Sequence, residues 1–307
     1  EIGMRFHPTR GSMSLSVKDG GLPPDDVVAD DDEILAASEA AVRRHHDRSH
    51  GSMVQIALAP CSPFSVTEDL MVRSAELARQ LDVRLHTHFA ENAEDDAYSL
   101  EKFGCRPMEY LERTGWCSDR TWVAHCVMPN HDEIHRLGAA GIGVAHCPSS
   151  NLILASGISP VVPMRAAGVK VGLGVDGSSS ADSASVWMEA RQAMLLAKLR
   201  DGAHAGTARM ALEMATVGGA GCLGREGEIG VLAPGAVADV TIWRLEGPVF
   251  AGALADPIEA WLRCGPVSAW HTIVNGRFVV RDGELVHPDI HRALRSHARH
   301  AARIQQL

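Results

Sequence analysis

Three apolar segments of this 307-residue chain end in side chains that bind transition metals. The first leads from Val83 to His88 and Glu91, the second is Thr121 to His125, and the third is Val169 to Asp176. Imidazole and carboxylate suit Zn²⁺ or Fe²⁺, and a catalytic site needs about three protein ligands with one position left for water. In a parallel α/β barrel the carboxyl ends of the strands meet on one face. Three such ends in order therefore predict a common site.

Each motif alone has a simpler explanation. A histidine at a strand end is more often structural than a ligand, and an aspartate after a Gly-rich strand is commonly a turn residue or a helix cap. His146 ends a further apolar segment, and both a supporting role beside the metal and a purely structural role remain open for it. All three segments end in such side chains at the expected end of a strand, and this common position favours a metal site over these structural interpretations.

Composition limits the classes of function. With 46% hydrophobic and 22% charged residues the chain is typical of a globular enzyme, and its net charge of −9 argues against nucleic acid or an anionic membrane as a partner. No apolar run approaches the ~20 residues of a membrane helix, and no signal peptide opens the chain. The cysteines form no C-x-x-C pair, which predicts reduced thiols and a cytoplasmic protein. They are Cys61, Cys105, Cys117, Cys126, Cys147, Cys222 and Cys264.

Strand-like and helix-like segments alternate over the first two thirds of the chain, which predicts a parallel sheet. The six predicted strands are Ile2 to Phe6, Met53 to Ala59, Val83 to Phe89, Thr121 to His125, Ile142 to His146 and Val169 to Asp176. An open doubly wound sheet is the alternative, but no Gly-rich dinucleotide loop follows a first strand. We therefore expect a TIM-like (β/α)8 barrel, which needs eight strands, with its first two strands before Glu1.

The periodicity changes after this region. We expect a barrel domain over residues 1–225, a small β-sandwich domain over 226–285 and a C-terminal helix over 286–307. Asn275-Gly276 predicts a tight hairpin turn within the β domain. The polar stretch from Thr9 to Asp32 is too long for a simple connection and is expected to be either an active-site lid or a mobile insertion.

These motifs resemble the amidohydrolase superfamily, in particular its branch of cytosine, guanine and S-adenosylhomocysteine deaminases and triazine hydrolases. The resemblance covers nearly the whole chain, and Gly3 to Ser14 is most similar to the 8-oxoguanine deaminases and their hydroxyatrazine-hydrolase relatives. The motifs are His88-x-x-Glu91, Ala124-His125-Cys126, His146-Cys147-Pro148-Ser149-Ser150-Asn151, Gly174-Val175-Asp176-Gly177, and Pro234 to Asp239 followed by Val274-Asn275-Gly276.

The resemblance implies one divalent metal, with zinc favoured and iron as the alternative, held by His88 and Asp176. The family supplies two further imidazoles from a His-x-His at its first barrel strand, and nothing before His86 matches that motif. His86-Thr87-His88 has the spacing but occupies the fifth-strand position. The missing strands and the missing ligands point to one absent segment, without which we expect the barrel not to close and the metal site to be incomplete.

The resemblance also implies a reaction, the hydrolytic deamination of a purine-type heterocycle by metal-bound hydroxide. The expected conversion is 8-oxoguanine to urate and ammonia. Glu91 would transfer protons, His125 would hydrogen-bond the attacking hydroxide, and Asp176 would accept its proton. An s-triazine aminohydrolase and an inactive binding or scaffold homologue are the alternatives. Zinc deaminases with P-C-x-x-C are excluded, because Cys61-Ser62-Pro63-Phe64 lacks the second cysteine.

Four further residues are candidates for binding the substrate. They are Arg5, His7, Cys61 and Asn151. A surface ion pair is the competing interpretation for Arg5, and a helix or loop cap is the competing interpretation for Asn151. A small heterocyclic substrate and a homo-oligomer are the expected partners.

Overall fold

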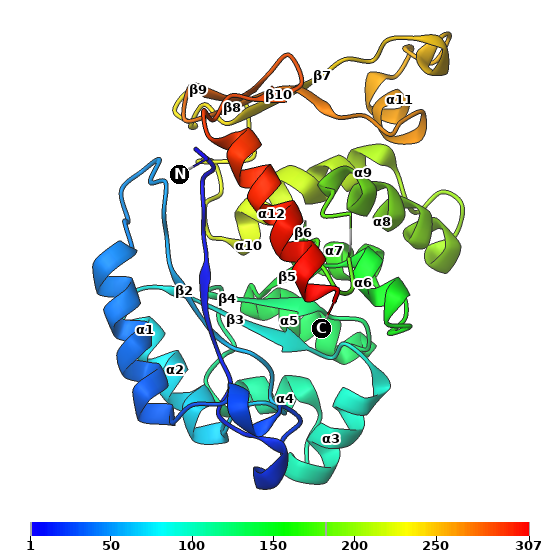
Figure 1. Cartoon of the computed structure of the whole chain (residues 1–307). Helices are drawn as coiled ribbons and strands as arrows, with labels where there is room; N and C mark the ends of the chain where they lie inside the picture. The colour runs from blue at the N-terminus through cyan, green and yellow to red at the C-terminus, as the bar shows by residue number, and fades with distance from the viewer. Residues whose placement is uncertain (1, 182, 307) are drawn as a thin grey trace.

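Six parallel strands form the main sheet, in sequential order from β1 to β6 (Figure 1). The structure is a computed structural model that describes residues 2–181 and 183–306. The strands are β1 (Thr9–Ser12), β2 (Ala57–Pro60), β3 (Arg84–Phe89), β4 (Thr121–His125), β5 (Gly143–His146) and β6 (Lys170–Leu173). The register of β3 and β4 pairs Phe89 with His125, so these two strands end side by side.

Helices follow the strands along the chain and cover the outer face of the sheet. They are α1 (Asp31–His45), α2 (Glu68–Leu81), α3 (Ala93–Phe103), α4 (Pro107–Arg113), α5 (His131–Ala140), α6 (Pro148–Ile153), α7 (Val161–Ala166), α8 (Val186–Asp201), α9 (Ala208–Glu213) and α10 (Gly219–Cys222). Among the described residues, no helix is both long and apolar enough to span a membrane. The strand order and the covering helices are those of a β/α barrel, which confirms the predicted fold class.

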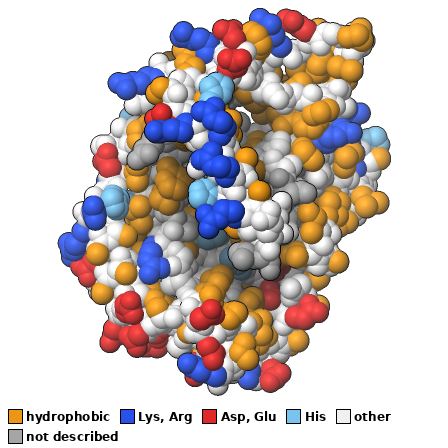
Figure 2. All heavy atoms as spheres, in the orientation of Figure 1, with side chains coloured by type: hydrophobic (Ala, Val, Ile, Leu, Met, Phe, Trp, Pro, Cys, Tyr) orange, Lys and Arg blue, Asp and Glu red, His pale blue; other side chains and the backbone are white. Residues whose placement is uncertain are grey.

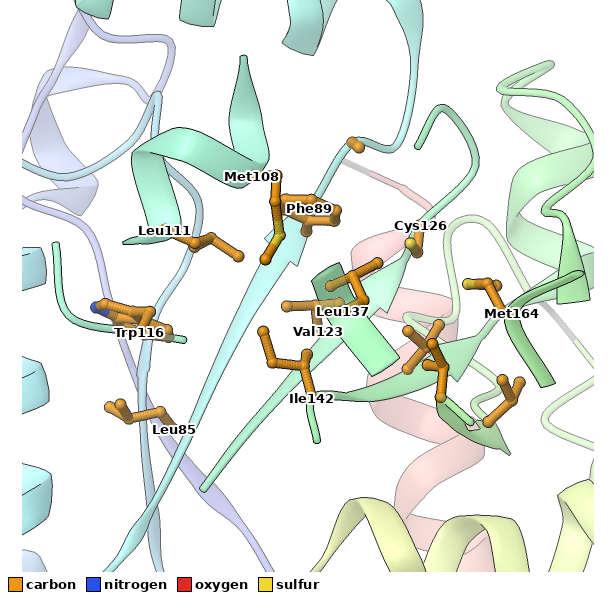
Figure 3. Close-up of a cluster of buried hydrophobic side chains, with 14 of the residues drawn as sticks. Leu85, Phe89, Met108, Leu111, Trp116, Val123, Cys126, Leu137, Ile142 and Met164 are labelled. Atoms are coloured by element: carbon orange, nitrogen blue, oxygen red, sulfur yellow. The ribbon is translucent and has the colours of Figure 1, made fainter. Parts of the chain in front are cut away.

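The side chains of β3 show how the sheet separates core from site. Leu85, Thr87 and Phe89 are buried, whereas His86 and His88 point to the opposite, inner face and are only partly buried. This alternation follows from the two-residue period of a strand. Of the buried set, Leu85 and Phe89 pack with α4 and α5 into the main hydrophobic core (Figure 3).

Glycines bring the segment after α9 against β6. A Cβ on Gly218 would lie 2.0 Å from the Val171 carbonyl oxygen, and a Cβ on Gly172 would lie 2.8 Å from the Cα of Gly219. Any side chain at either position would push helix and strand apart. Met214–Gly218 forms a π-helical turn that joins α9 to α10 along this contact. The glycines therefore fix the position of the last strand and, with it, of Asp176.

The first strand differs from its prediction. Ile2 to Phe6 forms only an isolated bridge, between Phe6 and Val54, while Thr9–Ser12, predicted as loop, forms β1. β1 has only one neighbouring strand among the described residues and is polar. Its sequence therefore lacks the apolar run by which a buried strand is recognised. Backbone hydrogen bonds from Leu15 to Ser65 and from Ala29 to Met13 hold the segment that follows it.

A second, antiparallel sheet lies at the amino-terminal end of the barrel strands. Its strands, in the order β10-β9-β8-β7, are β7 (Val240–Trp243), β8 (Ala269–Val274), β9 (Arg277–Arg281) and β10 (Glu284–Leu285), and α11 (Pro257–Arg263) lies between β7 and β8. Val274 pairs with Arg277, and Asn275 and Gly276 have φ values of 49° and 76°. These are the positive φ values of a type I′ turn, so the predicted hairpin is confirmed.

The last helix, α12 (Ile290–Ile304), contributes no buried residue. Its arginines and histidines form a basic band across the face of the molecule in Figure 2, where the helix crosses in front of the barrel in Figure 1. The exposed fractions of Leu294 and Ile304 are 56% and 69%, so the apolar face of the helix is also open.

Candidate metal centre

Three side chains from three strand ends meet at the carboxyl end of the barrel. His88 ends β3, His125 ends β4, and Asp176 follows β6. Each offers one ligand atom, and these atoms all lie within 4.8 Å of one another. Two imidazole nitrogens and a carboxylate oxygen form a donor set that suits zinc or iron, so the arrangement fits a divalent metal.

The backbone is strained where two of these groups are presented. His125 has φ of 69° and Asp176 has φ of 61°, in the left-handed region that residues other than glycine rarely adopt. Such conformations cost about 1–3 kcal/mol each and persist only when the surrounding structure imposes them. The turn after each strand thus directs the side chain into the barrel mouth instead of along the strand.

Hydrogen bonds at the other ring nitrogen orient both imidazoles. His88 Nδ1 contacts the backbone carbonyl of Cys61, and His125 Nδ1 lies 3.0 Å from Oδ1 of Asn151. The two rings stack with their centroids 5.3 Å apart. Because both oxygens can only accept, each Nδ1 carries a proton. The Nε2 of neutral His125 then keeps its lone pair for the site, and the Nε2 of His88 gains one when that ring loses its second proton.

Burial and neighbouring groups shift the pKa values of the cluster. Burial lowers the pKa of His125, against the raising effect of the Glu91 carboxylate. Burial also lowers the pKa of His88, but the thiol and carbonyl of Cys61 raise it to about 9. A cation that binds His88 therefore has to displace a proton, which makes metal affinity depend on pH.

Asp176 is held in its charged form. Its Oδ2 accepts from the Ser150 hydroxyl at 2.6 Å, and its Oδ1 accepts from the Gly177 amide at 2.8 Å. Burial raises the pKa of Asp176, but these two donors outweigh that effect and keep the pKa below its ordinary value. The carboxylate is therefore available as a ligand or proton acceptor at neutral pH.

Glu91 lies against the same imidazole. Its Oε2 is 3.6 Å from Nε2 of His125, and Oδ2 of Asp176 is 3.9 Å from that nitrogen. The Glu91 amide donates to Asp95 at 2.8 Å, which fixes the turn that carries the side chain. Two carboxylates thus flank one imidazole, an arrangement that can accept and return protons beside a bound metal.

A cavity of about 520 Å³ opens next to the cluster. Cys61, His86, His88 and Asp176 line it together with residues of β1, Val27 and the end of β2. Its size is that of a small-molecule site. Cys61, a candidate substrate-binding residue from the sequence, lies in the wall of this cavity.

Arg5 and His7 lie elsewhere. They line a different cavity at the amino-terminal end of the strands, beside the antiparallel sheet. Arg5 Nε is 2.6 Å from Oδ2 of Asp239, and its Nη1 donates to the carbonyls of Gly51 and Ser52. The structure therefore corrects the assignment of Arg5 to substrate binding, because an ion pair with a partner 234 residues away already engages its guanidinium.

His7 packs edge-on against Trp122, with the ring centroids 5.8 Å apart. Burial lowers its pKa to about 4, so the ring is neutral at physiological pH. His7 lies just before the start of β1, at the amino-terminal end of the barrel strands. The metal-centre cluster lies at the opposite, carboxyl end. Its assignment to substrate binding is therefore corrected as well.

Replacing Arg5 with methionine is expected to lower the free energy of unfolding by roughly 3 kcal/mol, because it leaves Asp239 partly buried without its cation. KM and kcat should not change. Denaturant unfolding and steady-state kinetics check this, with Arg44→Met on the exposed face of α1 as the control. A raised KM with unchanged stability would restore Arg5 to the substrate site.

His146 is a buried, neutral imidazole at the end of β5. Only 1% of it is exposed, and among the described residues its Nδ1 has no hydrogen-bond partner. Burial lowers its pKa to about 3, with a further lowering from His125. Above the unfolded pKa near 6.5 neither state binds a proton. Below it only the unfolded state does, so stability is lost as the pH falls toward 3.

The pH dependence of unfolding gives a direct check on His146. Between about pH 6.5 and pH 5 this residue should account for a loss of about 2 kcal/mol in the free energy of unfolding. The variant His146→Phe should lack that share and show a shallower decline, whatever its stability at neutral pH. Equal slopes for the two proteins would mean that His146 is protonated in the folded state.

Asn151 has a different place from the one predicted, and Ser150 was not predicted to act at the site. Asn151 is 1% exposed and contacts His125 instead of lining the cavity. It makes no helix-capping hydrogen bond, because the residue before α6 is Cys147. Ser149-Ser150-Asn151 could be recognised as a motif in the sequence. The sequence alone does not show which side chains these residues contact.

Comparisons with known proteins agree with this geometry. The model of the amidohydrolase family matches residues 1–279. The chain is 49% identical over 283 residues to an 8-oxoguanine deaminase of Pseudomonas aeruginosa, covering 92% of this chain and 63% of that protein. It is 37% identical to a hydroxydechloroatrazine ethylaminohydrolase of Pseudomonas sp. (strain ADP), covering 92% and 59%. The chain thus spans less than two thirds of the length of these relatives.

Solved structures give the same picture. Atrazine chlorohydrolase from Arthrobacter aurescens TC1, complexed with zinc, superposes with a TM-score of 0.90 at 34% identity, over 96% of this chain and 65% of that one. An adenosine deaminase from Xanthomonas campestris with bound zinc superposes with a TM-score of 0.87 at 29% identity, over 100% and 67%. With the strand-end cluster and the family match over most of its length, the chain belongs to the amidohydrolase family.

Proposed function

We propose that this protein is a metal-dependent deaminase that converts 8-oxoguanine and water to urate and ammonia. The observation that carries the proposal is the 49% identity to an 8-oxoguanine deaminase across 92% of the chain, a span that contains the whole strand-end cluster. The cavity beside that cluster, about 520 Å³, has room for a bicyclic base.

We assign the metal to His88, Asp176 and, in addition to the two residues named from the sequence, His125. Zinc is the proposed ion, because two related structures contain it, and iron is the alternative for the same donors. When bound, such a cation acidifies water enough to make a nucleophile available near pH 7.

The protein's own residues would manage the protons. Asp176, whose pKa is held low, accepts a proton from the attacking water. The attacking water gives up two protons in turn, and Glu91 delivers one to the ring nitrogen next to the attacked carbon and the other to the departing amine. His125 stays neutral between the two carboxylates, with its Nε2 lone pair available to the metal, and this role replaces the hydrogen bond to the attacking hydroxide that the resemblance implied. Cys61, in the cavity wall, contacts the heterocycle.

Other properties of the proposal follow from the same chain. All seven cysteines are free, which supports a reducing, cytoplasmic setting. We propose that the protein forms a homo-oligomer. We also propose that residues 1–225 form the barrel domain, residues 226–285 the β-sandwich domain and residues 286–307 the terminal helix.

The test is product release by the complete protein, including the segment expected to carry His-x-His, after supplementation with zinc. The substrates are 8-oxoguanine, guanine, isocytosine, cytosine and hydroxyatrazine, with ammonia and alkylamine measured separately. We expect ammonia, with the highest kcat/KM on 8-oxoguanine. Failure to release ammonia from any purine by a metal-loaded, folded protein would overturn the proposal.

A triazine hydrolase is the second candidate. It is favoured by the 37% identity to an ethylaminohydrolase and by the TM-score of 0.90 to an atrazine chlorohydrolase. The same metal ligands and acid-base groups serve either ring. Release of alkylamine from hydroxyatrazine, with no ammonia from 8-oxoguanine, would select this candidate.

A further inference from the structure

One turn of α6 contacts two of the metal-centre residues. Ser149, Ser150 and Asn151 are consecutive and all buried. The Ser150 hydroxyl donates to Oδ2 of Asp176 at 2.6 Å, and Oδ1 of Asn151 lies 3.0 Å from Nδ1 of His125. A single rigid turn therefore contacts groups that come from two different strands.

The turn is itself anchored. The amide of Ser149 donates to Oε2 of Glu189 at 2.9 Å, and its hydroxyl contacts the same carboxylate. Glu189 belongs to α8 and is 1% exposed. A buried carboxylate that accepts two hydrogen bonds from one residue fixes the start of α6 relative to the barrel.

The buried side chain of Asn151 has His125 as its hydrogen-bond partner. Within the described part of the chain its Nδ2 has no hydrogen-bond partner, so its amide is engaged only with His125. A carbonyl oxygen accepts but does not donate, so the contact favours the tautomer with a proton on Nδ1. The Nε2 that faces Glu91 and Asp176 then has a free lone pair.

The backbone conformation explains why such a support is needed. His125 and Asp176 both have positive φ values, which the surrounding structure has to enforce. Both of these residues are contacted by the same turn of α6. Side-chain hydrogen bonds from one turn can hold both strained residues in a fixed relation.

We propose that Ser150 and Asn151 form a clamp of positioning residues, in which Asn151 sets the tautomer of His125 and Ser150 orients Asp176. The clamp fixes Nε2 of His125 3.9 Å from Oδ2 of Asp176. This proposal rests on the proposed function and deepens it, because it says how the chain prepares the metal centre and its proton acceptor.

The test compares Asn151→Leu, which removes the acceptor at similar size, with Asn151→Asp, which keeps it. We expect Asn151→Leu to lower kcat about 10–100-fold with little change in KM, the usual loss when the support of a metal-site histidine is removed. Asn151→Asp should recover most of that loss. Leu152→Ala, an exposed change on the same helix, is the matched control and should behave as the unaltered protein.

A second readout needs no substrate. Nitrogen-15 NMR of the imidazoles in the metal-free protein, at a pH where they are neutral, reports which ring nitrogen of His125 carries the proton. We expect Nδ1 in the unaltered protein and in Asn151→Asp, and a mixture in Asn151→Leu. An unchanged tautomer in Asn151→Leu, or equal losses of kcat in both variants, would overturn the clamp. If no purine is deaminated, the proposed function fails, while the NMR result still decides the clamp.

Discussion

The variant Glu91→Gln is expected to lose about 10²–10⁴-fold in kcat while it keeps its fold and its bound metal. Glutamine has nearly the shape of glutamate but cannot accept or release a proton. Glu91 faces Nε2 of His125 at 3.6 Å, and its side chain is only 14% exposed, so solvent cannot readily replace it as a proton carrier. Steady-state kinetics on 8-oxoguanine measure the loss, and metal content and thermal unfolding are measured on the same sample.

The control for this variant is Glu94→Gln. Glu94 lies in the first turn of α3, three residues further along, and is exposed to solvent. The change removes the same charge from the same region without touching the metal centre. Full activity in Glu91→Gln would remove Glu91 from the proton pathway, and an equal loss in both variants would point to a general electrostatic effect.

The position of the centre followed from the sequence because parallel strands impose it. His88, His125 and Asp176 each end an apolar segment, and the carboxyl ends of adjacent parallel strands lie on one face. Knowledge of the strand ends was therefore enough to bring the three side chains together, as the structure does. The Asn275-Gly276 hairpin was predictable for a similarly local reason, since its turn type depends on two residues.

Other features depend on partners that no local pattern reveals. Arg5 forms an ion pair with Asp239, which is distant in sequence. β1 has a polar sequence and becomes a strand only by pairing with β2. Asn151 shows the same limit within the site, since its neighbours in sequence suggest a cap and only the packing of α6 places it against His125. Contacts of this kind are set by tertiary packing, which overrides local preference.

Metal dependence gives the last prediction. Zinc that binds only the folded state should stabilise it by about 2.7 kcal/mol when free zinc is about 100 times Kd. His88→Ala removes one of three donor groups that lie within 4.8 Å of one another and should abolish most of this gain. The measurement is the zinc-induced shift in denaturant unfolding, together with metal content after dialysis.

The matched control removes a histidine that could bind zinc at the surface. His131 and His135 lie one turn apart on α5, both exposed, with their Nε2 atoms 3.4 Å apart, close enough to share an adventitious ion. If the strand-end cluster is the zinc site, His135→Ala should retain the full zinc-induced increase in the free energy of unfolding. Loss of the zinc effect in His135→Ala but not in His88→Ala would place the ion on the helix surface and leave the barrel cluster without its proposed metal.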